Sequence, residues 1–190
     1  MSAVFISEQD FDQNLLAGQT LQKGEYDQCT FRNINFENGN FSSFVFNECE
    51  FIDCNLSLAK LAGTAIREVL FKDCKMFGLN FSDCNEFNLK FRFENCQLNN
   101  SVLYKTDIRK TVFKSCNLSE TDFAECNLSG AVFSECDLNG AVFENTNLEG
   151  ADFRTSFHYQ INPTSNRLKN ATFLRSEVHG LLQSFKIKIE

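Results

Sequence analysis

The most constraining feature of this sequence is a five-residue period of large apolar side chains. Every fifth residue from Leu21 to Phe81 is large and apolar, and so is every fifth residue from Phe93 to Phe153. At 43% hydrophobic content, twenty-six consecutive matches would arise by chance with a probability on the order of 10⁻¹⁰. A period of five fits neither a helix, with about 3.6 residues per turn, nor the alternation of an isolated strand. The chain must therefore bend at regular intervals.

A polygonal coil accommodates such a period. If each five-residue unit forms one side and four sides close a turn, every central residue points inward and residues twenty apart stack at roughly 4.8 Å. Residues twenty apart are alike: Phe113 aligns with Phe133 and Phe153, and Leu118 with Leu138. Ladders of aromatic rings stabilise a core by offset stacking. The sequence predicts an all-β, four-sided rod of six or seven coils, roughly 30 Å long.

A second inward position lies two residues before each centre, and small side chains occupy most of these positions. All nine cysteines fall there: Cys29, Cys49, Cys54, Cys74, Cys84, Cys96, Cys116, Cys126 and Cys136. Stacked thiols roughly 4.8 Å apart are farther apart than the Cβ atoms of a usual disulfide, and the count is odd. We expect buried free thiols, without disulfides or a metal site.

The phase of the period changes once, in residues 83–90. This segment adds two residues and puts Glu86 where an apolar centre is due. It predicts a bulge or short loop inside a single domain spanning residues 1–190, because linker composition is lacking. The predicted parts of that domain are a first stack at 11–81, the loop at 82–92, a second stack at 93–153 and a C-terminal cap at 154–190.

The C-terminal segment must hide the last coil, because a solenoid end exposes core and strand edges. Ser176 is a candidate cap for a short helix, and residues 185–190 alternate like a strand. We therefore expect a helical and strand cap that also forms a homodimer interface. The apolar residues predicted to seal this end are Phe173, Leu181, Leu182, Phe185, Ile187 and Ile189.

Several units share a motif that identifies a family. They are Ala131–Glu135, Ala141–Asn145, Ala151–Thr155, Cys126–Gly130 and Cys136–Gly140. They resemble the A-[DN]-[LF]-x-x motif of pentapeptide-repeat proteins, over about residues 11–153. The resemblance implies a right-handed quadrilateral β-helix. Through Glu50–Leu58 and Phe71–Met76, the chain is most similar to albicidin-resistance-type members, which protect type II topoisomerases as acidic, rod-shaped dimers resembling duplex DNA.

Charge is distributed unevenly along the chain. The formal charge of −7 disfavours direct binding to nucleic-acid phosphates. Residues 115–153 contain no Lys or Arg but eight acids, the candidate partner-binding residues: Glu120, Asp122, Glu125, Glu135, Asp137, Glu144, Glu149 and Asp152. Residues 154–190 carry a net charge of +4, from six basic and two acidic residues. The acidic coils are either a solvated surface that aids solubility or a docking field for a basic protein partner.

The remaining features favour a binding protein over an enzyme. The two histidines, His158 and His179, lie outside the repeats, and the chain has no phosphate-binding loop or nucleophile elbow. We expect no cofactor. The N-terminus lacks the features of a signal peptide and no stretch is long enough to span a bilayer, which predicts a cytoplasmic protein.

Three functions remain open. The first is a DNA mimic directed at DNA gyrase that confers resistance or immunity. The second is a scaffold or interaction module for another protein. The third, an enzyme, would require an open cavity lined by polar groups, whereas the predicted interior is filled by Phe and Leu.

Overall fold

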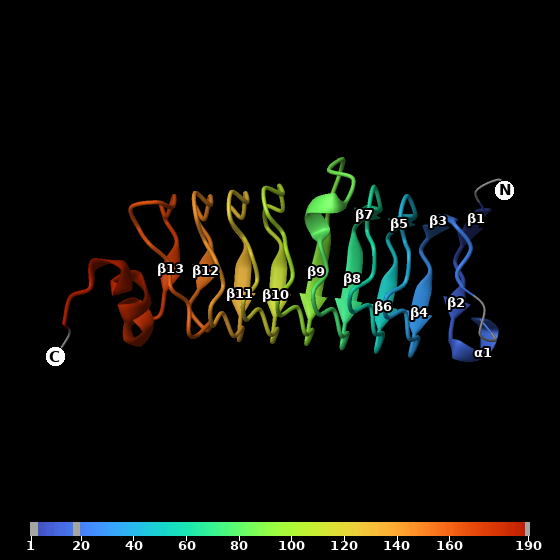
Figure 1. The fold of residues 1–190 in the computed structure, drawn as a ribbon, viewed down its shortest axis with the longest axis horizontal. Helices are drawn as coiled ribbons and strands as arrows, with labels where there is room; N and C mark the ends of the chain where they lie inside the picture. The colour runs from blue at the N-terminus through green and yellow to red at the C-terminus, as the bar shows by residue number, and fades with distance from the viewer. Residues whose placement is uncertain (1–3, 17–19, 189–190) are drawn as a thin grey trace.

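The computed structural model describes residues 4–16 and 20–188. Figure 1 shows a rod of stacked coils with the two termini at opposite ends. A nine-stranded sheet runs along it in the order β13-β12-β11-β10-β9-β8-β6-β4-β2, and a four-stranded sheet, β1-β3-β5-β7, lies at the N-terminal end. Every strand pair in the described residues is parallel: neighbouring strands lie one coil apart. This confirms the predicted β-helix.

The strands are short, as expected when the chain turns every five residues. The four-stranded sheet contains β1 (Val4–Ser7), β3 (Gly24–Asp27), β5 (Val45–Asn47) and β7 (Ala65–Arg67). The larger sheet contains β2 (Asp10–Phe11), β4 (Thr30–Arg32), β6 (Glu50–Ile52), β8 (Val69–Lys72), β9 (Phe91–Glu94), β10 (Val112–Lys114), β11 (Val132–Ser134), β12 (Asp152–Phe153) and β13 (Thr172–Phe173).

Four faces close each coil, and we number them by the inward residue at their centre in one coil. Face 1 is centred on Phe113 and carries the nine-stranded sheet. Faces 2, 3 and 4 are centred on Leu118, Phe123 and Leu128. All four centres are buried. Corresponding residues in successive coils are twenty apart, as in the pairing of Phe113 with Phe133.

The predicted centres form the core. Of the twenty-six, all are buried except Leu21, which is half-buried in the first coil. The Phe columns stack closely: the ring centroids of Phe113 and Phe133 are 5.0 Å apart and those of Phe133 and Phe153 are 4.7 Å apart, with interplanar angles of 5° and 9°. From the second coil onward, the interior is thus filled by side chains, as close packing requires.

The residues flanking each centre explain the rest of the motif. Asn or Asp before the centre accepts a hydrogen bond from the backbone N–H two residues later, as Asn117 Oδ1 does from Ser119 N at 3.0 Å. Residues at many of the corners have positive φ: the value is 56° at Glu120 and 70° at Gly140. At the small inward site, hydroxyls donate to a carbonyl of the preceding coil, as in Thr121 Oγ1 to Leu98 O at 3.1 Å.

The extra residues form a loop on face 4. The register across it is twenty-two, because Val69 pairs with Phe91. A short 3₁₀ turn, η1 (Phe81–Asp83), leads into this loop, which rises above the neighbouring coils in Figure 1. At its tip, Phe87 is 68% exposed and lies beneath the guanidinium of Arg67, 5.8 Å from the ring centroid.

The rod is longer than the predicted six or seven coils. Nine strands in one sheet define eight steps, so at 4.8 Å per step the strand stack is about 38 Å long. The underestimate arose because coils continue beyond Phe153: Phe173 stacks on Phe153 at 5.2 Å. In the irregular segment between Phe153 and Phe173, the side chains of Tyr159 and Ile161 fill the interior in place of regularly spaced central residues.

Two predicted details of the C-terminal cap are wrong. The cap consists of two 3₁₀ helices, η2 (Arg175–Leu181) and η3 (Gln183–Phe185). Leu174, not Ser176, occupies the N-cap position of η2, and no side chain caps it. The alternating segment at 185–190 is not a strand as far as it is described, because Phe185 ends η3 and Lys186 is left-handed. The predicted helical cap is therefore present without the strand.

Candidate functional site

The structure distributes the eight candidate acids over all four faces. Glu135 and Asp152 belong to face 1, Asp137 to face 2 and Glu149 to face 4. Asp122, Glu125 and Glu144 belong to face 3, and Glu120 lies at the corner between faces 2 and 3. Because the four faces point in different directions, one flat partner surface cannot contact all eight acids. The candidate site must therefore be sought on a single face.

Three acids outside face 3 are paired with basic side chains of the C-terminal segment. Asp137 lies 3.0 Å from His158 Nδ1, Glu149 lies 2.8 Å from Arg167, and Asp152 lies 2.7 Å from Arg154. The hydrogen bond from Arg154 lowers the pKa of Asp152 to about 2. Arg154 and Arg167 thus reduce the negative field near Asp152 and Glu149, whereas His158 does so near Asp137 only when it is protonated.

The fourth acid outside face 3, Glu135, also has a neighbour in the structure. Its carboxylate accepts a hydrogen bond from the Ser115 hydroxyl at 2.8 Å, twenty residues earlier on the same corner. Its backbone N–H donates to Thr155 Oγ1 in the next coil at 3.0 Å. Glu135 therefore takes part in a corner-to-corner contact between coils.

The acids around face 3 form a different kind of group. Glu120, Asp122, Glu125 and Glu144 take part in no ion pair within residues 4–16 and 20–188. Lys105 lies one coil below Glu125 on the same corner, so the local balance is four negative charges to one positive. Such a group, with a net charge of about −3, produces a negative potential directed outward from one side of the rod.

Exposed apolar side chains lie among these four acids. Tyr104 and Val142 are each 40% exposed, and Tyr104 donates a hydrogen bond to Glu125 Oε1 at 2.9 Å. That hydrogen bond raises the pKa of Tyr104. We call this surface the acidic face, defined by Glu120, Asp122, Glu125, Glu144, Tyr104 and Val142. The acidic face thus combines four carboxylates with two partly exposed side chains that carry apolar surface.

The three aspartates among the eight candidate acids also have a structural role, which the sequence analysis did not predict. Asp122, Asp137 and Asp152 each accept a hydrogen bond from the backbone N–H two residues later, at 2.9, 3.1 and 3.0 Å. The signal was available, because Asn occupies the equivalent position in many units and makes the same contact. Substitution by Asn therefore removes the negative charge at these positions and keeps the hydrogen bond to the backbone.

The predicted dimer residues divide into two groups. Phe173 and Leu181 are half-buried and pack against the core. Leu182 is half-buried, whereas Phe185 and Ile187 are 51% and 57% exposed, and Ile189 lies outside the described residues. The cap therefore closes the shaft and leaves the apolar side chains of Phe185 and Ile187 on its outer surface.

Gly180 is expected to be essential for docking the cap. Its carbonyl accepts a hydrogen bond from Ile161 N at 3.0 Å, and a Cβ at this position would collide with the Tyr159 carbonyl oxygen. Gly180→Ala should therefore destabilise the protein by about 1–3 kcal/mol through overpacking. Thermal unfolding, with Ser184→Ala on the exposed surface of η3 as control, would measure this. Equal melting temperatures for the two variants would contradict it.

The cysteines and histidines do not assemble into a metal centre in the described part of the chain. All nine cysteines are buried, and burial raises the pKa of Cys49 and Cys84 to about 12. Thiols donate to backbone carbonyls, as Cys136 does to Phe113 O at 3.4 Å. Across residues 4–16 and 20–188, no three His, Cys, Asp or Glu side chains are grouped as metal ligands, and no helix could cross a membrane.

Comparison with known structures gives matches over the whole rod. Three structures of QnrB1, a plasmid-mediated fluoroquinolone resistance protein, are similar to this chain at 15% identity. Two trypsin-treated variants give TM-scores of 0.63 and 0.62, covering 99% and 100% of this chain and 98% and 100% of theirs. The full-length form gives 0.57, covering 98% of this chain and 100% of its own. At this identity the likeness concerns the fold.

The sequence comparisons identify the family. No curated protein matches the chain. The pattern of the pentapeptide repeat region matches three overlapping segments, residues 25–92, 89–157 and 113–181, which together span most of the chain. With the five-residue units, the twenty-residue register and the filled shaft, these matches show that the chain belongs to the pentapeptide-repeat family.

Proposed function

We propose that this protein is a non-enzymatic binding protein that docks its acidic face on a basic surface of a partner protein, with DNA gyrase as the first candidate. The observation that carries the proposal is the group of four carboxylates without ion pairs around Tyr104 and Val142. Charges of one sign attract a partner of the opposite sign, and exposed apolar side chains contribute to the contact once water is excluded.

Gyrase is named because of the resemblance to topoisomerase-protecting members of the family. QnrB1, whose structure has the same fold, is a fluoroquinolone resistance protein. A rod about 38 Å long could occupy part of a channel built for duplex DNA, and a homodimer through the cap would lengthen it. Pairing of Arg154 and Arg167 with acids of the rod reduces the positive charge that the cap would bring to such a dimer.

The filled shaft supports a role without catalysis. The central residues of successive coils fill the interior, so the outer walls are the surface available for recognition. The thiols of the interior lie among packed Phe and Leu side chains. In this proposal the protein acts by occupying a site on its partner. Resistance or immunity would follow from competition at that site and not from modification of a drug.

A gyrase supercoiling assay tests the proposal directly. Purified protein is expected to bind gyrase and to change either its supercoiling activity or its sensitivity to an inhibitor, in a manner that saturates with protein concentration. Bovine serum albumin at equal concentration is the control. If neither binding nor a change in activity is observed, gyrase is not the partner. A stable complex with another basic protein through the same face would then favour the scaffold role.

A further inference from the structure

The N-terminal end of the rod contains an apolar cleft that arises from an irregular first coil. The short helix α1 (Gln13–Leu16) stands where later coils have face 2, and Asp12 Oδ1 accepts a hydrogen bond from Leu15 N at 2.8 Å. Phe36 and Phe41, the first aromatic centres of faces 2 and 3, therefore meet Leu16 and Leu21 instead of another complete coil. The first coil leaves a space between these two layers.

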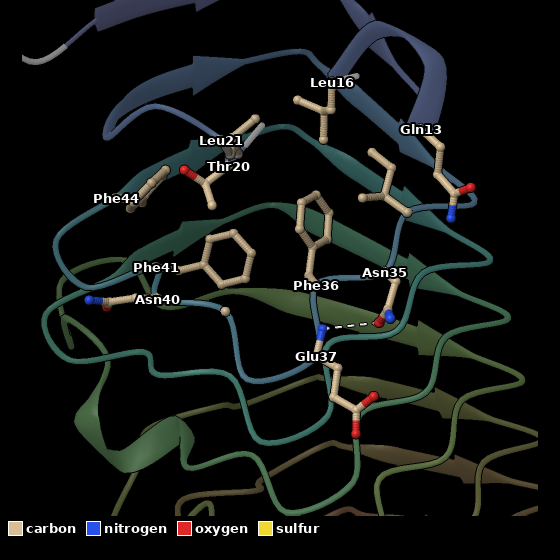
Figure 2. Close-up of a pocket in the computed structure, with 12 residues that line it drawn as sticks. Gln13, Leu16, Thr20, Leu21, Asn35, Phe36, Glu37, Asn40, Phe41 and Phe44 are labelled. Carbon is tan, nitrogen blue, oxygen red and sulfur yellow. Dashed lines mark hydrogen bonds between the residues drawn. The ribbon is translucent and has the colours of Figure 1, made fainter. Parts of the chain in front are cut away.

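Three aromatic rings line one side of this space. Phe36 and Phe41 pack edge to face with centroids 5.2 Å apart, and Phe41 and Phe44 do the same at 5.5 Å. Figure 2 shows the rings of Phe36 and Phe41 turned toward the side of the cleft that carries Leu16, Leu21 and Thr20. The cleft measures about 450 Å³, within the range of pockets that hold small molecules.

The charges of the cleft restrict its ligand. Among its described lining residues, Glu37 is the one charged side chain, and its carboxylate accepts a hydrogen bond from Asn55 Nδ2 at 3.3 Å. In Figure 2 this carboxylate is directed away from the rings. Neither an anionic nor a cationic group would find a partner charge within the apolar part. Gln13 and Thr20 at the rim can each donate and accept a hydrogen bond.

From this combination of size, rings and polarity, we propose that the cleft is a binding site for a neutral, ring-containing small molecule. The apolar rings of the ligand lie against Phe36 and Phe41, where edge-to-face and offset contacts are favourable. One hydrogen-bonding group of the ligand faces Gln13 or Thr20. This site lies at the opposite end of the rod from the cap and is independent of the acidic face and its partner.

The neutral dye N-phenyl-1-naphthylamine tests this site in the full-length protein. Its fluorescence is expected to rise and shift to the blue, with saturation at one molecule per chain. The related sulfonate, 8-anilinonaphthalene-1-sulfonate, has similar rings and a negative charge, and should bind at least about tenfold more weakly. Equal affinity for the two dyes, or no saturable binding of the neutral one, would overturn the proposal.

Matched variants locate the dye. Leu16→Phe and Leu21→Phe each add a ring within the cleft and should weaken dye binding about tenfold. Leu15→Phe is the control, because the side chain of Leu15 is 53% exposed and does not line the cleft. Circular dichroism and thermal unfolding establish which variants are folded. If either cleft variant is folded and binds the dye as the control does, the dye lies elsewhere and the assigned site is wrong.

Discussion

Binding to gyrase is expected to fall at least about a hundredfold when the four carboxylates of the acidic face are replaced by amides. The substitutions are Glu120→Gln, Asp122→Asn, Glu125→Gln and Glu144→Gln. Each removes one negative charge and keeps the size of the side chain. Asn at position 122 can still accept the hydrogen bond that Asp122 receives from Ala124 N, so the turn is preserved. Isothermal titration at several salt concentrations would measure the loss.

A second set of four substitutions provides the matched control. Glu135→Gln, Asp137→Asn, Glu149→Gln and Asp152→Asn remove the same number of charges from the other faces. Because ion pairs near the surface contribute about 1 kcal/mol or less each, and because Asn at positions 137 and 152 can still accept the turn hydrogen bonds, this variant should remain folded. It should bind with nearly the wild-type affinity apart from a general electrostatic effect. Equal losses for the two sets would show that overall charge, and not the acidic face, determines binding.

The largest loss of stability is expected from Phe133→Ala. Phe133 is 1% exposed and stacks between Phe113 and Phe153 at 5.0 and 4.7 Å. Removing its ring leaves a cavity that neighbouring coils cannot fill without breaking the twenty-residue register, so a loss of about 3–5 kcal/mol is expected. Urea unfolding followed by circular dichroism measures it.

The adjacent outward residue is the control for this experiment. Val132 lies in the same strand and is half-buried, with its side chain on the outer surface of face 1. Val132→Ala should cost no more than about 1 kcal/mol. Since repeat proteins are held together by contacts between neighbouring coils, hydrogen exchange should show the damage in the coils on either side of Phe133 first. A uniform loss of protection along the rod would contradict the expectation that the damage begins in the coils next to Phe133.

The repeating part of the fold could be predicted from the sequence because one rule applies to every coil. Phe113, Phe133 and Phe153 share a column for the reason that they are twenty residues apart. The irregular segment after Phe153 does not follow this rule, so its inward residues could not be predicted. It keeps the overall register, since Phe157 pairs with Asp137, but the apolar residues that enter the core are Tyr159 and Ile161. A fixed spacing cannot detect an inward residue that has moved.

The candidate site was only partly predictable for a related reason. Charge counted along the chain identified eight acids, but it did not tell which face each one occupies or which cation lies one coil away. The pairs of Glu149 with Arg167 and Asp137 with His158 join residues eighteen and twenty-one apart. Charges must therefore be compared between successive coils as well as along the chain. Comparing residues about twenty positions apart would have revealed the pairs of Asp137 and Glu149, but it would also have placed Lys105 beside Glu125, so side-chain geometry was needed to tell a paired acid from an unpaired one.

The twenty-residue register, which holds outside the loop on face 4, has a consequence for how such a protein can change its dimensions. Removing or duplicating one whole circuit of twenty residues would leave every remaining contact between circuits of the same kind, since each meets only the one before and the one after. The distance between the N-terminal cleft and the C-terminal cap can therefore be altered in increments of about 4.8 Å. The length of the rod can therefore be changed one circuit at a time, without redesigning its interior.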